Sequence, residues 1–153
     1  MKAYVYIGVT DESVLSDGRV DGLLSELRQG GAQVHVMPPG DTSIEGADIL
    51  ISVGGDGTFL AASSIAALSG VPVVGVNLGR LGFLSENRPE HVAKALLSGD
   101  YVIEDATVLR AVPKDETLFE NAGMWPFAFN EFTVHRTGSA ILGVDVCVNG
   151  TPL

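Results

Sequence analysis

Short apolar runs that alternate with helix-like segments constrain the fold of this chain more than any other feature. The runs cover residues 3–9, 33–37, 49–53 and 71–76. Most are nearly uninterrupted, as strands are when helices bury both faces of a parallel sheet. We therefore predict an α/β fold whose open, mostly parallel sheet carries helices on both faces.

Three segments between and after these runs have the residue spacing of helices. Four apolar side chains of the first fall at i, i+3, i+4 and i+7 and so share one helix face: Val20, Leu23, Leu24 and Leu27. Residues 59–68 are rich in Ala and Leu and stop at Gly70. Residues 89–97 begin with a proline, which suits a first helical turn, and Gly99 closes them.

The pattern changes near residue 100. Beyond it no segment has clear helical periodicity, and strand-like stretches cover residues 107–112, 127–135 and 142–148. We therefore predict an α/β domain over residues 1–100, followed by part of a β-rich domain over residues 101–153.

The last strand-like stretch ends in a hairpin signal. Apolar residues alternate along residues 142–148, and Asn149-Gly150, a dipeptide typical of tight hairpin turns, follows them. Only Thr151, Pro152 and Leu153 remain, so we expect no return strand and an unpaired edge. The chain is therefore expected to be cut inside a domain.

Charge and cysteine content narrow the classes of partner. The chain has 19 acidic and 9 basic residues and a net charge of -10, which repels nucleic acid and anionic membranes. Cys147 is the only cysteine, which excludes an internal disulfide, and no Cys/His cluster has metal-ligand spacing. Residues 3–9 are too short to span a bilayer. We expect a soluble cytoplasmic protein.

A glycine-rich turn follows the buried strand at residues 49–53. Its sequence is Gly54-Gly55-Asp56-Gly57-Thr58, and a helix is expected after it. Glycines let backbone N–H groups converge on phosphate oxygens beside a helix N-terminus. The Asp56 carboxylate would repel a phosphate unless it holds a metal ion or takes a proton from an attacking hydroxyl. Both roles point to phosphoryl transfer.

Two common kinds of phosphate-binding loop do not match this turn. The sequence contains neither a G-x-x-x-x-G-K-[ST] loop nor a G-x-G-x-x-G pattern after a strand, which argues against a Walker ATPase or a Rossmann dehydrogenase. A plain tight turn, in which Asp56 caps the following helix, stays open as an alternative.

Three stretches resemble the NAD kinase family. They are Ile51 to Leu60 around the turn, Val74 to Leu84 (VGVNLGRLGFL), and Asn130-Glu131 in a strand that ends at His135-Arg136. The first is shared with diacylglycerol and sphingosine kinases and, loosely, with 6-phosphofructokinases. The second and third favour NAD kinase. The resemblance covers nearly the whole chain, as an N-terminal domain plus the start of a C-terminal one.

The resemblance implies a role for each matching residue. Asp56 would act as general base toward the 2′-hydroxyl of the adenosine ribose of NAD, which attacks the terminal phosphate of ATP. Phe83 would pack near the adenine, and Asn130 and Glu131 would grip the ribose. Gly54, Gly55, Gly57 and Thr58 would cradle phosphates. Asn77 and Arg80 are further candidates for nucleotide binding. Arg80 stands where the family varies, so it is a candidate because a cation suits phosphate oxygens.

The resemblance also implies substrates, a metal and an assembly. ATP or polyphosphate is the expected donor, NAD or NADH the acceptor, and magnesium is expected to be bound mostly by substrate phosphates. The full-length protein is expected to be a homo-oligomer, a dimer or a tetramer. Family members continue with more of the second domain, so the 153-residue chain alone is expected to be inactive or poorly folded.

Purely structural roles compete with several of these assignments. Phe83 could be an ordinary core residue, and Asn77 could simply end its strand. Asn130 and Glu131 are adjacent, so in a regular strand they would point to opposite faces unless a strand end re-aims one. His135 and Arg136 are interpreted as a solvated strand end. Cys147 is interpreted as structural.

Two further functions remain open. A lipid or sphingoid-base kinase would share Asp56 but would need an apolar acceptor channel. A catalytically inactive nucleotide-binding fragment is the non-enzymatic alternative.

Overall fold

The computed structural model describes residues 1–8, 14, 16–79, 82–114, 117, 126–139 and 141–153. The chain divides into two compact units, Met1–Val108 and Leu109–Leu153. The domain boundary near residue 100 stays a prediction, and each unit is described by itself.

The first unit contains a parallel sheet of four strands. They are β1 (Lys2–Ile7), β2 (Gln33–Val36), β3 (Ile49–Val53) and β4 (Val73–Val76). The strands lie in the order β2-β1-β3-β4, and every pairing is parallel, with Val5 opposite Ile51 and Ile51 opposite Val74. The predicted sheet is confirmed. β3, which is central, is buried at all of its residues, whereas in β1 only Ala3 and Val5 are fully buried.

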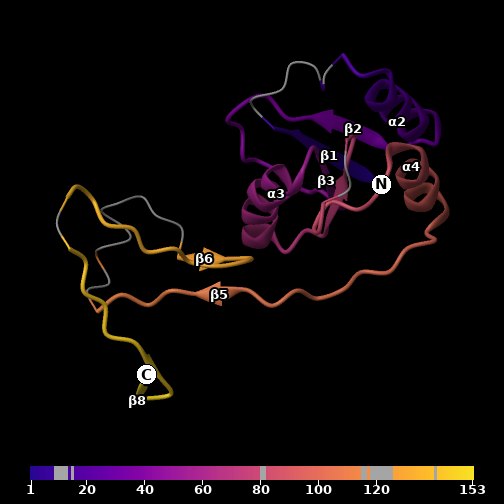
Figure 1. The fold of residues 1–153 in the computed structure, drawn as a ribbon. Helices are drawn as coiled ribbons and strands as arrows, with labels where there is room; N and C mark the ends of the chain where they lie inside the picture. The colour runs from indigo at the N-terminus through magenta and orange to yellow at the C-terminus, as the bar shows by residue number, and fades with distance from the viewer. Residues whose placement is uncertain (9–13, 15, 80–81, 115–116, 118–125, 140) are drawn as a thin grey trace. The chain divides into compact units, whose positions relative to one another are not determined.

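In the part of the chain that the structure describes, three helices cover the two faces of this sheet. They are α2 (Gly18–Gln29), α3 (Asp56–Ser69) and α4 (Pro89–Ser98). Figure 1 shows α2 and α4 on one side of the sheet and α3 on the other. The predicted helices on both faces are thereby confirmed, and α3 begins three residues earlier than the Ala-rich stretch at residues 59–68 indicated.

Each face of the sheet has its own apolar core. Under α2 and α4, one core joins helix residues to side chains of β1 and β3, including Leu23, Leu27, Val5 and Ile51. Under α3, a smaller core includes Leu50, Ala62 and Ala66. Alternate residues of β3 therefore supply both cores, which fixes the register of this strand between the helices.

Glycines end the helices where the sequence predicts. Gly70 follows α3 with φ 64°, and Gly99 follows α4 with φ 73°. These left-handed conformations suit glycine because it has no Cβ. The ends of α3 and α4 thus follow from local sequence.

The strands of the second unit are shorter than predicted. Antiparallel β5 (Leu109–Arg110) and β6 (Phe127–Ala128) pair with each other, as do β7 (Cys147–Val148) and β8 (Thr151–Pro152). The long strands predicted over residues 107–112, 127–135 and 142–148 are wrong in extent. The alternating residues Val144 and Val146 are 60% and 50% exposed, so no layer of described residues buries them. An isolated strand pair without a buried face is only marginally stable.

The predicted absence of a return strand after Asn149-Gly150 is also wrong. Asn149 and Gly150 have φ values of 52° and 82°, as both central residues of a type I′ turn require. Thr151 then pairs with Val148, and Pro152 with Cys147. Two residues were enough to return because the turn itself sets the strand register.

Among the helices of the described residues, none combines the length and apolar character that crossing a bilayer requires.

The buried hydroxyl of Ser52 leads us to predict an effect on stability. Ser52 lies in β3 and is 1% exposed, and its Oγ has no hydrogen-bond partner among the residues that the structure describes. Replacing it by Ala removes an unsatisfied polar group, so Ser52→Ala should keep or raise the free energy of unfolding, by up to about 2 kcal/mol. Urea titration followed by circular dichroism measures this change.

The neighbouring Leu50→Ala is the matched control, because Leu50 is fully buried in the α3 core. It should lower the free energy of unfolding by about 2–5 kcal/mol. A similar loss in Ser52→Ala would mean that the hydroxyl has a partner.

Candidate active site

The glycine-rich turn lies where β3 ends and α3 begins. Gly55 is the N-cap of α3, and Asp56 is the first residue of this helix. No side chain caps this helix end. The alternative in which Asp56 serves as a helix cap is therefore wrong.

Thr58 fills the space beside two glycines of neighbouring strand ends. A Cβ built on Gly54 would lie 2.4 Å from Thr58 Oγ1, and a Cβ built on Gly8 would lie 2.7 Å from the same atom. Real Cβ atoms do not approach other atoms so closely. The Thr58 side chain therefore packs directly against the backbone at the ends of β1 and β3.

The Asp56 carboxylate accepts three hydrogen bonds from consecutive backbone N–H groups. Phe83 N–H donates to Oδ2 at 3.0 Å. Leu84 N–H and Ser85 N–H both donate to Oδ1, each at 3.1 Å. The carboxylate thus faces the loop at residues 82–85, which follows β4 in the sequence.

These hydrogen bonds change the acidity of the group. The N–H groups of Leu84 and Phe83, with a smaller contribution from Ser85, lower the pKa of Asp56 below its ordinary value of 3.8. Asp56 is therefore ionised at neutral pH and oriented as a hydrogen-bond acceptor.

Ser85 ties the loop to the glycine-rich turn. Its side chain is fully buried, and its Oγ donates to the Gly54 carbonyl oxygen at 3.1 Å. Its own carbonyl oxygen accepts a hydrogen bond from Asn77 Nδ2 at 3.3 Å. One serine therefore contacts the turn, Asp56 and the end of β4.

Asn77 and Asn87 hold the two ends of the segment after β4. Asn77 is 7% exposed, and its Oδ1 accepts a hydrogen bond from Gly79 N–H at 2.8 Å. The Asn87 carbonyl oxygen accepts from Asn77 N–H at 2.8 Å, and Asn87 Nδ2 donates to the Gly75 carbonyl oxygen at 3.1 Å. Both asparagines thus organise the loop that carries the donors to Asp56.

The structure brings together the described candidate residues of the first unit. Gly54, Gly55, Gly57 and Thr58 surround Asp56 at the start of α3. The Phe83 side chain is 94% exposed, so the expectation of an ordinary core residue is wrong. Arg80 lies outside the described residues.

The remaining candidates belong to the second unit. Asn130 and Glu131 lie beyond the end of β6 and are exposed. The prediction that they lie inside a strand is wrong. Because they lie outside β6, their side chains are not forced to point to opposite faces, as neighbours in a regular strand are. His135 and Arg136 are exposed too, and they are outside any strand. Cys147 lies in β7 and is exposed, so its burial does not support the structural role expected for it.

Sequence reasoning missed four residues of this arrangement. They are Gly8, Gly82, Ser85 and Asn87. Gly82 lies within the stretch that carries the family resemblance and Ser85 directly follows it, so a search for polar residues next to that stretch would have found Ser85.

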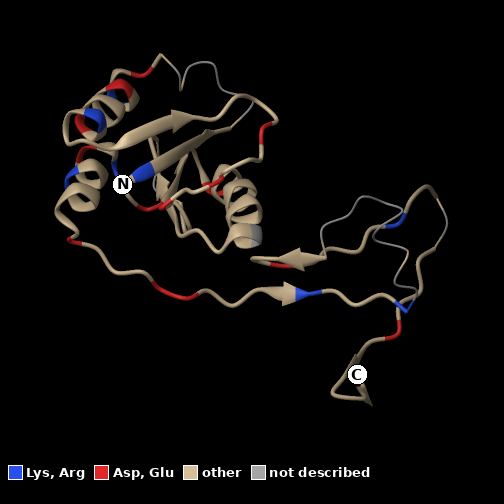
Figure 2. Ribbon diagram, turned by 180° about the vertical axis from the view of Figure 1, so that it is seen from behind, with Lys and Arg blue, Asp and Glu red and all other residues tan. Residues whose placement is uncertain are grey.

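Backbone groups dominate the electrostatics of the site. Neither residues 54–58 nor residues 82–87 contain Lys or Arg, and α3 carries no basic residue (Figure 2). Within these ranges, attraction for an anion therefore comes from N–H groups of the turn and the start of α3.

No ready-made metal centre accompanies this site. Across the part of the chain that the structure describes, no three His, Cys, Asp or Glu side chains gather in a way that could hold a metal ion. Asp56 already accepts three N–H bonds. The described residues thus do not fit a dedicated magnesium cage, and a cation carried by nucleotide phosphates requires none.

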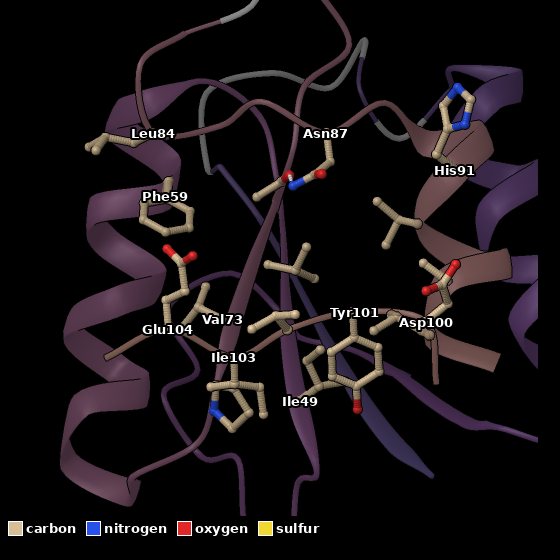
Figure 3. Close-up of a pocket in the computed structure, with 17 residues that line it drawn as sticks. Ile49, Phe59, Val73, Leu84, Asn87, His91, Asp100, Tyr101, Ile103 and Glu104 are labelled. Atoms are coloured by element: carbon tan, nitrogen blue, oxygen red, sulfur yellow. Dashed lines mark hydrogen bonds between the residues drawn. The ribbon is translucent and has the colours of Figure 1, made fainter. Parts of the chain in front are cut away.

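A pocket of about 540 Å³ lies beside β4 in the first unit. Figure 3 shows Phe59 and Glu104 at its α3 side and His91 and Asp100 at its α4 side. No residue of the Gly54–Thr58 turn lines it. Leu84 and Asn87 do line it, so the pocket borders the segment whose N–H groups bind Asp56.

A parallel sheet with helices on both faces and a glycine-rich turn after a central strand places the first unit in the class of open α/β domains, which bind ligands at the carboxyl ends of their strands. Comparison with known proteins then gives the family. Residues 40–99 match the family described as ATP-NAD kinase N-terminal domain. These residues belong to that family.

Relatives and a solved structure carry the same family name. The chain is 33% identical over 132 residues to the NAD kinase of Mycobacterium bovis, covering 84% of this chain and 42% of the relative. It is 36% identical over 111 residues to that of Bacteroides fragilis, covering 70% and 37%. A crystal structure of an Archaeoglobus fulgidus NAD kinase in complex with ATP matches at 26% identity and a TM-score of 0.48, over 72% of this chain and 40% of that one. The chain spans about two fifths of these proteins.

The contacts of Asp56 predict its titration. Since its folded-state pKa lies below that of the unfolded chain, its contribution to stability is complete above the unfolded value and is lost as pH falls through the folded value. Carboxyl ¹³C NMR should give a midpoint below 3.8. The amide resonances of Phe83 to Ser85 should move in the same transition. A midpoint at or above 3.8 would contradict the three hydrogen bonds.

Proposed function

We propose that the protein to which this chain belongs is an NAD kinase, which transfers a phosphoryl group from ATP to the 2′-hydroxyl of the adenosine ribose of NAD. The observation that carries the proposal is the Asp56 carboxylate, held by three amides at the start of α3 within the stretch that matches the family. Polyphosphate is the alternative donor, and NADH the alternative acceptor.

Two groups of residues would bind the substrates. In this proposal the backbone N–H groups of Gly54, Gly55 and Gly57 and the Thr58 hydroxyl contact phosphate oxygens. The exposed Phe83 ring, at 94% exposure, is available to stack on the adenine. Asn130 and Glu131 are proposed to bind the ribose hydroxyls, since an amide and a carboxylate suit a diol.

Asn77 and Arg80 complete the proposed set. The Asn77 side chain supports the loop that carries Phe83, so we propose that it acts through that loop. A guanidinium such as that of Arg80 suits phosphate oxygens.

The proposed reaction is a single displacement. The ribose 2′-oxygen forms a bond to the terminal phosphorus of ATP, the bond from that phosphorus to ADP breaks, and the hydroxyl proton passes to Asp56. The transition state of such transfers is loose, so alignment matters more than base strength. A carboxylate with a lowered pKa can serve as the base, because the hydroxyl proton passes to it late in the transfer, when the bond to phosphorus is already forming. We propose that magnesium would be bound mostly by the phosphates of ATP, where it would neutralise part of their charge.

Cellular setting and assembly are further parts of the proposal. We infer a cytoplasmic protein, because its single cysteine is unpaired and its charge of -10 opposes anionic surfaces. We propose a homo-oligomer for the full-length protein, following the family resemblance.

Asp56→Asn tests the function in the full-length protein. The amide keeps one acceptor oxygen but turns an NH₂ group toward N–H donors, so it cannot take the proton and also weakens the contact with residues 82–85. NADP formation from NAD and ATP should fall by about 10²–10⁴. A coupled assay specific for NADP measures the rate.

Asp21→Asn is the control, since Asp21 lies exposed in the first turn of α2. It should retain the wild-type rate. Parallel assays offer a diacylglycerol or a sphingoid base instead of NAD. Phosphorylation of a lipid without NADP formation would replace the proposal by a lipid kinase, and no phosphorylation of any acceptor would favour the non-catalytic alternative.

A further inference from the structure

The loop at residues 82–85 and the glycine-rich turn come from different strand ends, β4 and β3. Four hydrogen bonds join them: three from loop N–H groups to Asp56, and one from Ser85 Oγ to the Gly54 carbonyl oxygen. The position of the carboxylate therefore depends on how the loop is shaped and anchored.

We propose that Gly82 and Ser85 are positioning residues that seat the Asp56 carboxylate on the amides of residues 83–85, so that Asp56 and the Phe83 ring face the same substrate as one unit. This inference deepens the proposed function, and its consequence for turnover rests on that function. The geometry of the carboxylate can be tested without it.

Gly82 leaves the space that the carboxylate occupies. A Cβ built on Gly82 would lie 2.1 Å from Asp56 Oδ1 and 2.6 Å from Asp56 Cγ. No residue with a side chain can therefore stand at position 82 while Asp56 keeps this place. Either the loop or the carboxylate would have to move.

Ser85 anchors the far end of the loop. Its hydroxyl is fully buried and donates to Gly54, while its N–H donates to Asp56. Loss of the hydroxyl would leave the Gly54 carbonyl oxygen without this donor and would free Ser85 N–H to shift. Ser85 thus fixes the distance between the loop at residues 82–85 and the glycine-rich turn.

Phe83 couples the carboxylate to the substrate side of the loop. Its N–H donates to Asp56 Oδ2, whereas its ring is 94% exposed. When Asp56 fixes this N–H, it also limits where the ring can lie. A nucleotide base stacked on the ring and a hydroxyl bound to the carboxylate would then be placed by one backbone segment.

The first experiment compares two glycine substitutions by NMR. Gly82→Ala should displace the carboxylate from the amides, so the Asp56 carboxyl pKa should rise toward 3.8 and the Phe83 to Ser85 amides should lose their response to its titration. Gly79→Ala is the matched control in the same segment, because among the described residues its Cβ would meet only Asn77 Oδ1, at 3.8 Å. It should leave both signals unchanged.

The second experiment removes one hydroxyl. Ser85→Ala should speed hydrogen exchange at the amides of Phe83 and Leu84, whereas Ser64→Ala, which removes a hydroxyl bound to the Leu60 carbonyl oxygen on the exposed side of α3, should not. Circular dichroism establishes that both variants are folded. Equal exchange in the two variants, or an unchanged Asp56 titration in Gly82→Ala, would overturn the proposal.

Kinetics of the full-length protein separate this inference from the proposed function. Gly82→Ala should lower kcat for NADP formation by about 10- to 100-fold, since moving a reacting group by about 1 Å is costly in such a reaction. The acid limb of its pH profile should move to higher pH, because the pKa of Asp56 rises. Wild-type turnover in Gly82→Ala would overturn the positioning role. If the wild-type protein makes no NADP while the NMR differences hold, the function fails and the positioning of Asp56 stands.

Discussion

The hydrogen bonds between one carboxylate and three consecutive backbone amides determine the rest of the site. Asp56 stands at the start of α3, and the amides of Phe83, Leu84 and Ser85 belong to the segment after β4. An ionised carboxylate is the natural partner for such a cluster of donors, because charged acceptors form stronger hydrogen bonds than neutral ones. The loop is thereby held in one shape, and the carboxylate in one orientation.

The sheet explains why these groups can meet. In a parallel sheet the carboxyl ends of neighbouring strands lie along one edge, and β3 and β4 are neighbours. The glycine-rich turn and the segment after β4 therefore leave the sheet side by side. The apolar cores under α2, α4 and α3 fix the strands from both faces. The positions of the glycine-rich turn and of the segment after β4 are therefore set by packing far from the site.

The sequence predicted the first unit well and the details of its site less well. Apolar runs and helical spacing located β3 and α4, because those signals are local. The partners of Asp56 had no signature, since backbone amides are the same in every residue. In the second unit, alternation at Val144 and Val146 predicted a strand, yet alternation does not reveal whether another layer exists to bury one face. Asn130 and Glu131 were identified by family resemblance alone.

The contact of Thr58 with Gly8 and Gly54 joins the glycine-rich turn to a residue at the end of β1 that is far away in the sequence. A methyl group at either glycine collides with the threonine, and Gly54 in addition has φ 152°. Changes at these positions cannot be accepted independently: a larger residue at position 8 calls for a smaller one at position 58. Across the family, the residues at positions 8, 54 and 58 should therefore vary together. A designed variant of this turn has to select all three residues at the same time.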